Sequence, residues 1–207
     1  MNRSERRRRR NALRKRAMLL VISCALLCVL GVVASRAIRT EAARREREIL
    51  LAAYPIRYQE VVEECAAEFS LETERLYAVM LCESSFRADA VSGAGAVGLM
   101  QLLPDTAKWI AEKLGEEYND AMLTDPRQNA RLGSWYLSYL DRRFGGDLTK
   151  ATAAYHTGQN RVDEWLKDPA NSSDGAALEH IPSDATRGYV ERVLKAVEMY
   201  RELYGGK

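Results

Sequence analysis

Histidine and cysteine are scarce in this sequence of 207 residues, which contains two histidines and four cysteines. The spacing of the cysteines does not match a zinc motif, and we expect no metal and no other cofactor. The small numbers of glycine and proline, 13 and 5, exclude a collagen-like or low-complexity chain. Disorder throughout is also excluded, because 47% of the residues are apolar. What remains is one domain of ordinary size, with or without an appendage.

Charge is unevenly distributed along the chain, although the formal net charge is only +2. Residues 1–48 contain 14 Lys and Arg and 4 Asp and Glu, a net charge of +10, which leaves −8 for residues 49–207. A negative main body argues against nucleic acid as a partner. It also removes long-range attraction to anionic polymers, so recognition must rely on shape, hydrogen bonds and aromatic contacts.

The positive end is followed by a long uncharged run. Residues 17–34 are apolar or small, and nine basic residues precede them: Arg3, Arg6 to Arg10, Arg14, Lys15 and Arg16. A helix of this length is roughly 27 Å long, close to the hydrocarbon core of a membrane. We therefore predict a basic cytoplasmic tail at 1–16 and a single transmembrane anchor at 17–34. Because basic flanks stay inside, the rest of the chain is expected outside the cytoplasmic membrane.

Two other interpretations of the apolar run are kept. Val32-Val33-Ala34 is compatible with a cleaved signal peptide, and Val21-Ile22-Ser23-Cys24 with a lipoprotein cleavage box. In the anchor interpretation, Cys24 and Cys28 face the membrane. Cys65 and Cys82 would lie outside, where they either form a disulfide bond or stay as two buried thiols.

The rest of the chain is predicted to be mainly α-helical. Residues 35–55 are dense in Arg and Glu and form a helical stalk that ends before Pro55. After the stalk, apolar residues recur at helical spacing, and no segment shows the alternation of a strand. Helices are expected at 57–69, 71–84, 147–156, 160–165 and 183–204, and a loop at 85–97. Two more helices are indicated by their end signals. One runs from a cap at Asp105 or Thr106 to Gly115, and the other from Asp125-Pro126 to Phe144.

Glu83 is the residue whose position suggests chemistry. It lies on the apolar face of its predicted helix, in line with Leu76 and Met80, and at the C-terminal end. Burial and the negative end of the helix dipole both raise the pKa of a carboxyl group. A carboxyl group that stays protonated near neutral pH can act as a general acid. A solvated surface glutamate is the alternative that this position alone leaves open.

The surroundings of Glu83 resemble the soluble lytic transglycosylase (SLT) family. The resemblance covers residues 56–204, and several motifs occur in the family's order. They are Glu83-Ser84-Ser85-Phe86, Gly95-Ala96-Val97-Gly98-Leu99-Met100-Gln101-Leu102-Leu103-Pro104, Leu123-Thr124-Asp125-Pro126 with Asn129 and Gly133, Ala153-Ala154-Tyr155-His156-Thr157-Gly158, and Thr186-Arg187-Gly188-Tyr189-Val190.

This resemblance implies a lysozyme-like helical fold of the goose-lysozyme type, with a cleft for the glycan strands of peptidoglycan. It makes Glu83 the single catalytic acid and base. It further implies substrate-binding roles for Ser84, Met100, Gln101, Tyr155, His156 and Tyr189. Ordinary core packing remains the alternative for Met100 and for the two tyrosines.

Two positions depart from the family's usual pattern. The family has asparagine and alanine where this chain has His156 and Thr157, and it commonly has glutamate where this chain has Ala185. Histidine can donate or accept a hydrogen bond through different nitrogens, so selectivity or pH dependence at this position can differ. The alternative is that His156 only caps the end of its helix. Asp184 is a candidate to replace the missing glutamate.

The leading hypothesis is a membrane-anchored peptidoglycan lytic transglycosylase. It would cleave the bond between N-acetylmuramic acid and N-acetylglucosamine and leave a 1,6-anhydro end. One alternative is a hydrolytic muramidase on the same fold, for which Asp89 is the nearest candidate for a second carboxylate. The other is a non-catalytic scaffold that binds glycan. Glycan strands and the membrane are the partners expected; no protein partner is indicated.

Overall fold

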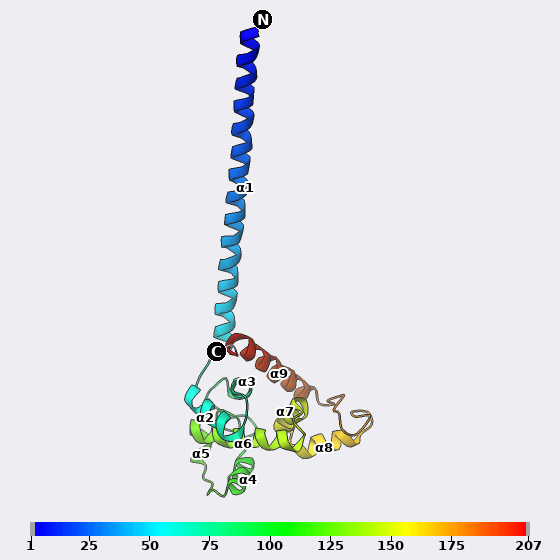
Figure 1. Ribbon diagram of the computed structural model, residues 1–207. Coiled ribbons are helices and arrows are strands. Elements are labelled where there is room, and N and C mark those ends of the chain that lie inside the picture. Colours follow the sequence, from blue (N-terminus) through cyan, green and yellow to red (C-terminus); the bar gives the residue numbers. More distant parts are fainter. Residues whose placement is uncertain (1–2, 206–207) are drawn as a thin grey trace. The chain divides into compact units, whose positions relative to one another are not determined.

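The computed structural model describes residues 3–205, except for several side chains between residues 3 and 29. In this part of the chain, the regular secondary structure is helical and strand pairing is limited to isolated bridges (Figure 1). The prediction of a mainly α fold is confirmed. The helices are α1 (Arg3–Ala53), α2 (Gln59–Phe69), α3 (Thr73–Ser84), α4 (Pro104–Leu114), α5 (Ala121–Thr124), α6 (Pro126–Arg143), α7 (Leu148–Thr157), α8 (Gln159–Lys167) and α9 (Asp184–Tyr204).

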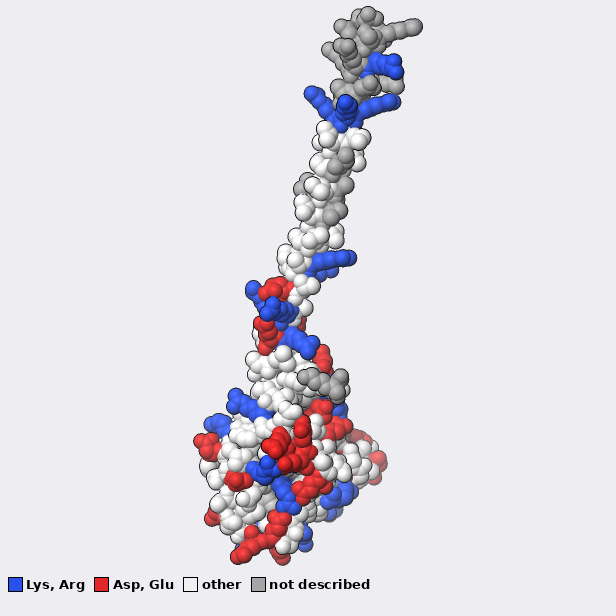
Figure 2. Space-filling view, turned by 60° about the vertical axis from the view of Figure 1, so that its left-hand side comes forward, with Lys and Arg blue, Asp and Glu red and all other residues white. Residues whose placement is uncertain are grey.

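The chain divides into two units, residues 1–53 and 54–207. The first unit is the helix α1, in which charged side chains occur on both sides of an uncharged stretch (Figure 2). Within the described residues, no helix is both long enough and apolar enough to cross a membrane. The predicted tail and anchor fall partly on residues outside this description. In the anchor these are Ala17, Ile22, Cys24, Ala25, Leu27, Cys28 and Val29.

The second unit is built around α6, which contributes to two clusters of buried side chains. Ala130 and Leu137, seven residues apart, face a cluster shared with α2, α3 and α9. Leu132, Tyr136 and Leu140 follow four-residue spacing and face a second cluster shared with α4, α5, α7 and α8. Tyr155 on α7 packs against both clusters and so marks the place where they meet.

The two cysteines of the second unit are free thiols. Cys65 of α2 is buried and Cys82 of α3 is half-buried. Of the two alternatives that the sequence left open, the structure therefore shows separate thiols and not a disulfide bond. Burial raises the pKa of both, to about 11 for Cys82, so both carry their protons at neutral pH.

Local sequence signals set most helix ends. The Asp125 side chain accepts a hydrogen bond of 2.8 Å from the backbone N–H of Gln128, and Asp147 caps α7 in the same way. The prediction that Asp105 or Thr106 caps a helix was wrong. Leu103 precedes α4 and Pro104 is its first residue, because proline fits the first turn and needs no N–H partner there.

The loop between α3 and α4 is held in place by Asn129 of α6. The fully buried Asn129 amide accepts from the Met100 N–H at 2.8 Å and donates to the Val97 and Leu123 carbonyls, each at 3.0 Å. Gly98 has φ +86°, and a Cβ there would lie 2.2 Å from the Leu123 oxygen. Only glycine allows this close approach. The loop is therefore fastened to α6 through its backbone.

Candidate active site

A cavity of about 420 Å³, here called the Glu83 cavity, brings together residues from distant parts of the chain. Four of the residues predicted from the sequence line it: Glu83, Gln101, Tyr155 and His156. They come from α3, from the loop before α4, and from α7. The other lining residues are Ser92, Ala94, Ala96, Leu102, Leu103, Thr106, Tyr136, Thr157 and Gly158.

Glu83 lies in the last turn of α3, and its carboxyl group is largely shielded from water. Burial raises the pKa of Glu83 to about 7, although the Tyr189 hydrogen bond and the Arg192 charge act in the opposite direction. Desolvation prevails because the charged form loses more hydration than these two partners replace. The Glu83 carboxyl group can therefore both donate and accept a proton near neutral pH.

Tyr189 of α9 holds the Glu83 carboxyl group in position. Its hydroxyl donates a hydrogen bond of 2.5 Å to Glu83 Oε1, and the residue is 2% exposed. The ring of His156 stacks on Tyr189, with 4.5 Å between the ring centroids and 29° between the planes. Tyr155 takes a different partner, since its hydroxyl donates to the Met100 carbonyl at 2.8 Å. The two tyrosines thus have separate tasks, one at the carboxyl group and one at the loop.

Ser84 and Met100, which were also predicted as site residues, do not line the cavity. The Ser84 hydroxyl is buried and donates to the Leu99 carbonyl at 2.8 Å. The Met100 side chain is fully buried against Gly133, where an added Cβ would lie 2.4 Å from its sulfur. Both side chains therefore lie outside the lining: Ser84 is bonded to the backbone of the loop, and Met100 packs against α6.

Gln101 lines the cavity in a left-handed conformation, with φ +48°. Its side-chain amide donates to the Ala90 and Gly98 carbonyls, each at 3.0 Å, which leaves its amide oxygen as the acceptor. Ser85 and Phe86, which follow Glu83 and Ser84, also have positive φ. Such strain in non-glycine residues persists only where surrounding contacts enforce it. Here it marks both ends of the loop that frames Glu83.

Of the described residues that line the cavity, only Glu83 carries a carboxyl group. Asp89 is exposed and lies outside the lining. Asp184, the candidate to replace a glutamate at Ala185, also lies outside it, and its carboxylate pairs with Arg187. Asp89 therefore contributes no second carboxylate to the lining, and Asp184 contributes no carboxylate there in place of the missing glutamate.

Sequence reasoning missed Tyr136 and Thr106, which line the cavity from α6 and α4. Tyr136 follows the apolar spacing of α6, so the sequence offered no signal beyond core packing. It also missed Arg192, whose charge acts on both Glu83 and His156. Arg192 lies one helical turn after Tyr189, and this spacing places both on the same side of α9.

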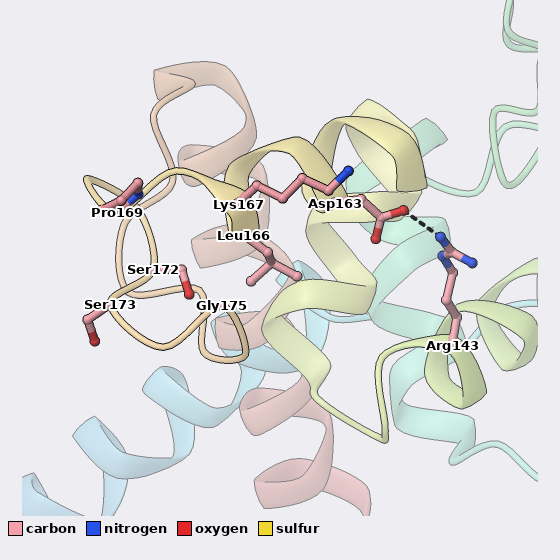
Figure 3. Close-up of a pocket in the computed structure, with 8 residues that line it drawn as sticks. All are labelled: Arg143, Asp163, Leu166, Lys167, Pro169, Ser172, Ser173 and Gly175. Carbon is pink, nitrogen blue, oxygen red and sulfur yellow. Dashed lines mark hydrogen bonds and ion pairs between the residues drawn. The ribbon is translucent and has the colours of Figure 1, made fainter.

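A second cavity, of about 670 Å³, lies beside α8 and the loop that follows it (Figure 3). Its lining shares no residue with the Glu83 cavity. The charged groups Arg143 and Asp163 point toward each other there and form an ion pair. The residues that line this second cavity include no buried acid, so the Glu83 cavity is the candidate active site.

The fold matches those of solved lytic transglycosylases. One is the structure of an inactive mutant of the lytic transglycosylase Slt from Pseudomonas aeruginosa, with a TM-score of 0.65 and 37% identity. The match covers 72% of this chain and 24% of that one. The pattern described as Transglycosylase SLT domain matches residues 60–177. The chain belongs to this family.

Curated relatives agree with this assignment. The soluble lytic murein transglycosylase of Escherichia coli (strain K12) is 32% identical over 157 residues, covering 74% of this chain and 24% of that protein. The membrane-bound lytic murein transglycosylase C of Glaesserella parasuis serovar 5 (strain SH0165) is 28% identical over 169 residues, covering 71% and 46%. This chain thus spans about a quarter of the Escherichia coli relative and under half of the other.

Proposed function

We propose that this protein is a peptidoglycan lytic transglycosylase that cleaves the β-1,4 bond between N-acetylmuramic acid and N-acetylglucosamine. One observation carries the proposal. Glu83 is the single carboxyl group among the described cavity-lining residues, and its pKa is raised to about 7. Gln101, Tyr155 and His156 contact the strand. Ser84, Met100 and Tyr189 position the loop and the acid.

The first step is cleavage of the glycosidic bond. Protonated Glu83 donates its proton to the glycosidic oxygen as the C1–O bond breaks, and positive charge grows at C1 of the muramic acid. The carbonyl oxygen of the 2-acetamido group stabilises this charge, as in substrate-assisted enzymes that lack a second carboxylate. The N-acetylglucosamine side leaves as an alcohol, and Glu83 is left ionised.

The second step closes a ring within the muramic acid. Ionised Glu83 removes the proton from the 6-hydroxyl, and the resulting oxygen forms a bond to C1. Because nucleophile and electrophile belong to one sugar, the effective molarity is far above that of a diffusing reactant. The acid is regenerated, the product is a 1,6-anhydro sugar, and no water is consumed.

Digestion of peptidoglycan in ¹⁸O-labelled water tests this function. We expect every new muramic end to be non-reducing and unlabelled, because the attacking oxygen comes from the substrate. Mass spectrometry of the products measures both properties. Labelled reducing ends would identify a hydrolase, and intact strands after prolonged incubation would point to a glycan-binding scaffold.

The location proposed for this enzyme is the outer face of the cytoplasmic membrane, with residues 17–34 as a single-pass anchor. The uncharged run and its basic flank support this, as do relatives named membrane-bound lytic murein transglycosylases. In cells stripped of wall, added protease should release the domain that follows Tyr54 and spare the tail. Detergent should then expose the tail. Protection of the whole chain in these wall-stripped cells before detergent is added would contradict this topology.

A further inference from the structure

His156 is fixed on two sides and open on a third. Its ring stacks on Tyr189, and its Nδ1 lies 3.2 Å from the Thr186 hydroxyl oxygen. The side chain is exposed and lines the Glu83 cavity. Within the described residues no hydrogen-bond partner contacts Nε2. The edge of the ring that carries Nε2 is therefore available to a ligand.

The tautomer of His156 is linked to the hydrogen bonds of Thr186. The Thr186 hydroxyl lies 3.1 Å from Ser183 Oγ, which also accepts the Thr186 backbone N–H at 3.3 Å. When the Thr186 proton is directed to Ser183, the buried Thr186 hydroxyl has only lone pairs to offer His156. In that arrangement Nδ1 is the protonated nitrogen and Nε2 of the neutral ring is unprotonated, whereas the opposite orientation of the two hydroxyls gives the other tautomer.

We infer that His156 is a specificity-determining residue whose Nε2 accepts a hydrogen bond from a donor on the bound glycan strand. This inference rests on the proposed function. The donor is an N–H or O–H group, carried either by the sugars or by an attached peptide. An asparagine at this position would offer both a donor and an acceptor, so histidine makes the subsite more selective.

The groups that face His156 favour its neutral form. Partial burial of the ring, whose accessible part faces the cavity, and the Arg192 guanidinium of α9 lower the pKa of His156 below its ordinary value. Tyr189 of α9 and Tyr155 of α7 have pKa values raised well above the ordinary value, so both are neutral in the working range. Tyr136 of α6 is neutral as well, since its pKa is raised to about 12. Glu83 of α3 is the remaining titratable group of the cavity.

The test measures strand binding in a variant that cannot turn over. In Glu83→Gln the glutamate no longer titrates, so a change of affinity between pH 7.5 and pH 5 reports on His156. We expect the Kd of soluble strands to rise about 3- to 10-fold on acidification, the range of one lost neutral hydrogen bond. The double variant Glu83→Gln/His156→Phe keeps the stacked ring, and its Kd should be weak at both pH values and unchanged between them.

Thr186 provides the matched control. Thr186→Val removes the hydroxyl that orients His156 and should raise Kd at pH 7.5, whereas Thr186→Ser should not. NMR of ¹⁵N-labelled histidine in the full chain reports the tautomer directly, and we expect Nε2 to be the unprotonated nitrogen. A protonated Nε2 at pH 7.5 would overturn the inference. Equal Kd values for Glu83→Gln with and without the His156→Phe substitution would overturn it too.

Two substrates locate the donor. The Kd values of strands with and without stem peptides are compared in the same variants. If His156→Phe weakens the binding of peptide-bearing strands only, the donor lies on the peptide. If the substitution weakens the binding of both kinds of strand equally, the donor lies on the sugars. Because Kd is measured without cleavage, absence of turnover by the wild-type chain would refute the proposed function alone. Absence of any strand binding would refute both.

Discussion

Replacing Glu83 with glutamine is expected to abolish glycan cleavage while leaving the fold and strand binding nearly intact. Glutamine has the same shape and can still accept the hydrogen bond from Tyr189, but it has no proton to transfer. Loss of general acid–base catalysis should lower turnover by at least about 10²–10⁴-fold. Chromatography of the products released from purified peptidoglycan measures the effect, and circular dichroism checks the fold.

Asp89→Asn is the matched control for this experiment. Asp89 is exposed and lies outside the lining of the Glu83 cavity, so its replacement should leave turnover within about twofold of wild type. Two results would contradict the assignment. Glu83→Gln could retain more than about a tenth of wild-type turnover, or Asp89→Asn could lose activity as severely, which would indicate hydrolysis by two carboxylates.

Activity should fall steeply on the alkaline side of pH 7. The first step needs protonated Glu83, whose pKa is raised to about 7 by burial. Below this pH most molecules hold the proton, and above it the protonated fraction falls about tenfold for each pH unit. A solvated glutamate would give the same decline near its ordinary pKa, below about pH 5. Initial rates of strand cleavage between pH 5 and pH 9 measure the pH at which activity declines, here called the alkaline limb of the pH–activity profile.

Tyr189→Phe should move the alkaline limb to higher pH. The Tyr189 hydroxyl donates to Glu83 Oε1 and so favours the ionised carboxylate, which lowers its pKa. Without this donor, burial raises the pKa of Glu83 further, so the protonated form persists to higher pH. Tyr155→Phe serves as the control, because the Tyr155 hydroxyl bonds to the Met100 carbonyl and the limb should stay in place. A shift of the limb in Tyr155→Phe alone would show that the carboxyl group has a different hydrogen-bond partner.

The helices were largely predictable because their signals are local. Asp125 with Pro126 marks the start of α6, and Gly115 with φ +74° follows the end of α4. The four-residue helix α5 was not predicted, since so short a segment carries no periodic pattern. The start of α4 was misplaced because Asp105 is a good capping residue, yet Pro104 already begins the helix.

The candidate site was predictable only in part. Glu83 could be found from its place on an apolar helix face, which is a short-range pattern. Its bond to Tyr189 joins residues 106 positions apart, and the contact between His156 and Thr186 depends on how α7 meets α9. A motif names the residues near a site, but it does not state which side chains face the ligand. Ser84 and Met100 belong to the motif and point into the protein instead.

The attachment of the loop to Asn129 has a consequence for the thermodynamics of strand binding. Fixing the backbone of a flexible residue costs about 1–2 kcal/mol in conformational entropy. Because the Met100 N–H and the Val97 carbonyl are bonded to Asn129 within the protein itself, the loop is ordered during folding. A glycan strand therefore binds to a preorganised surface, and its contacts contribute to affinity without offsetting the entropy of ordering this loop.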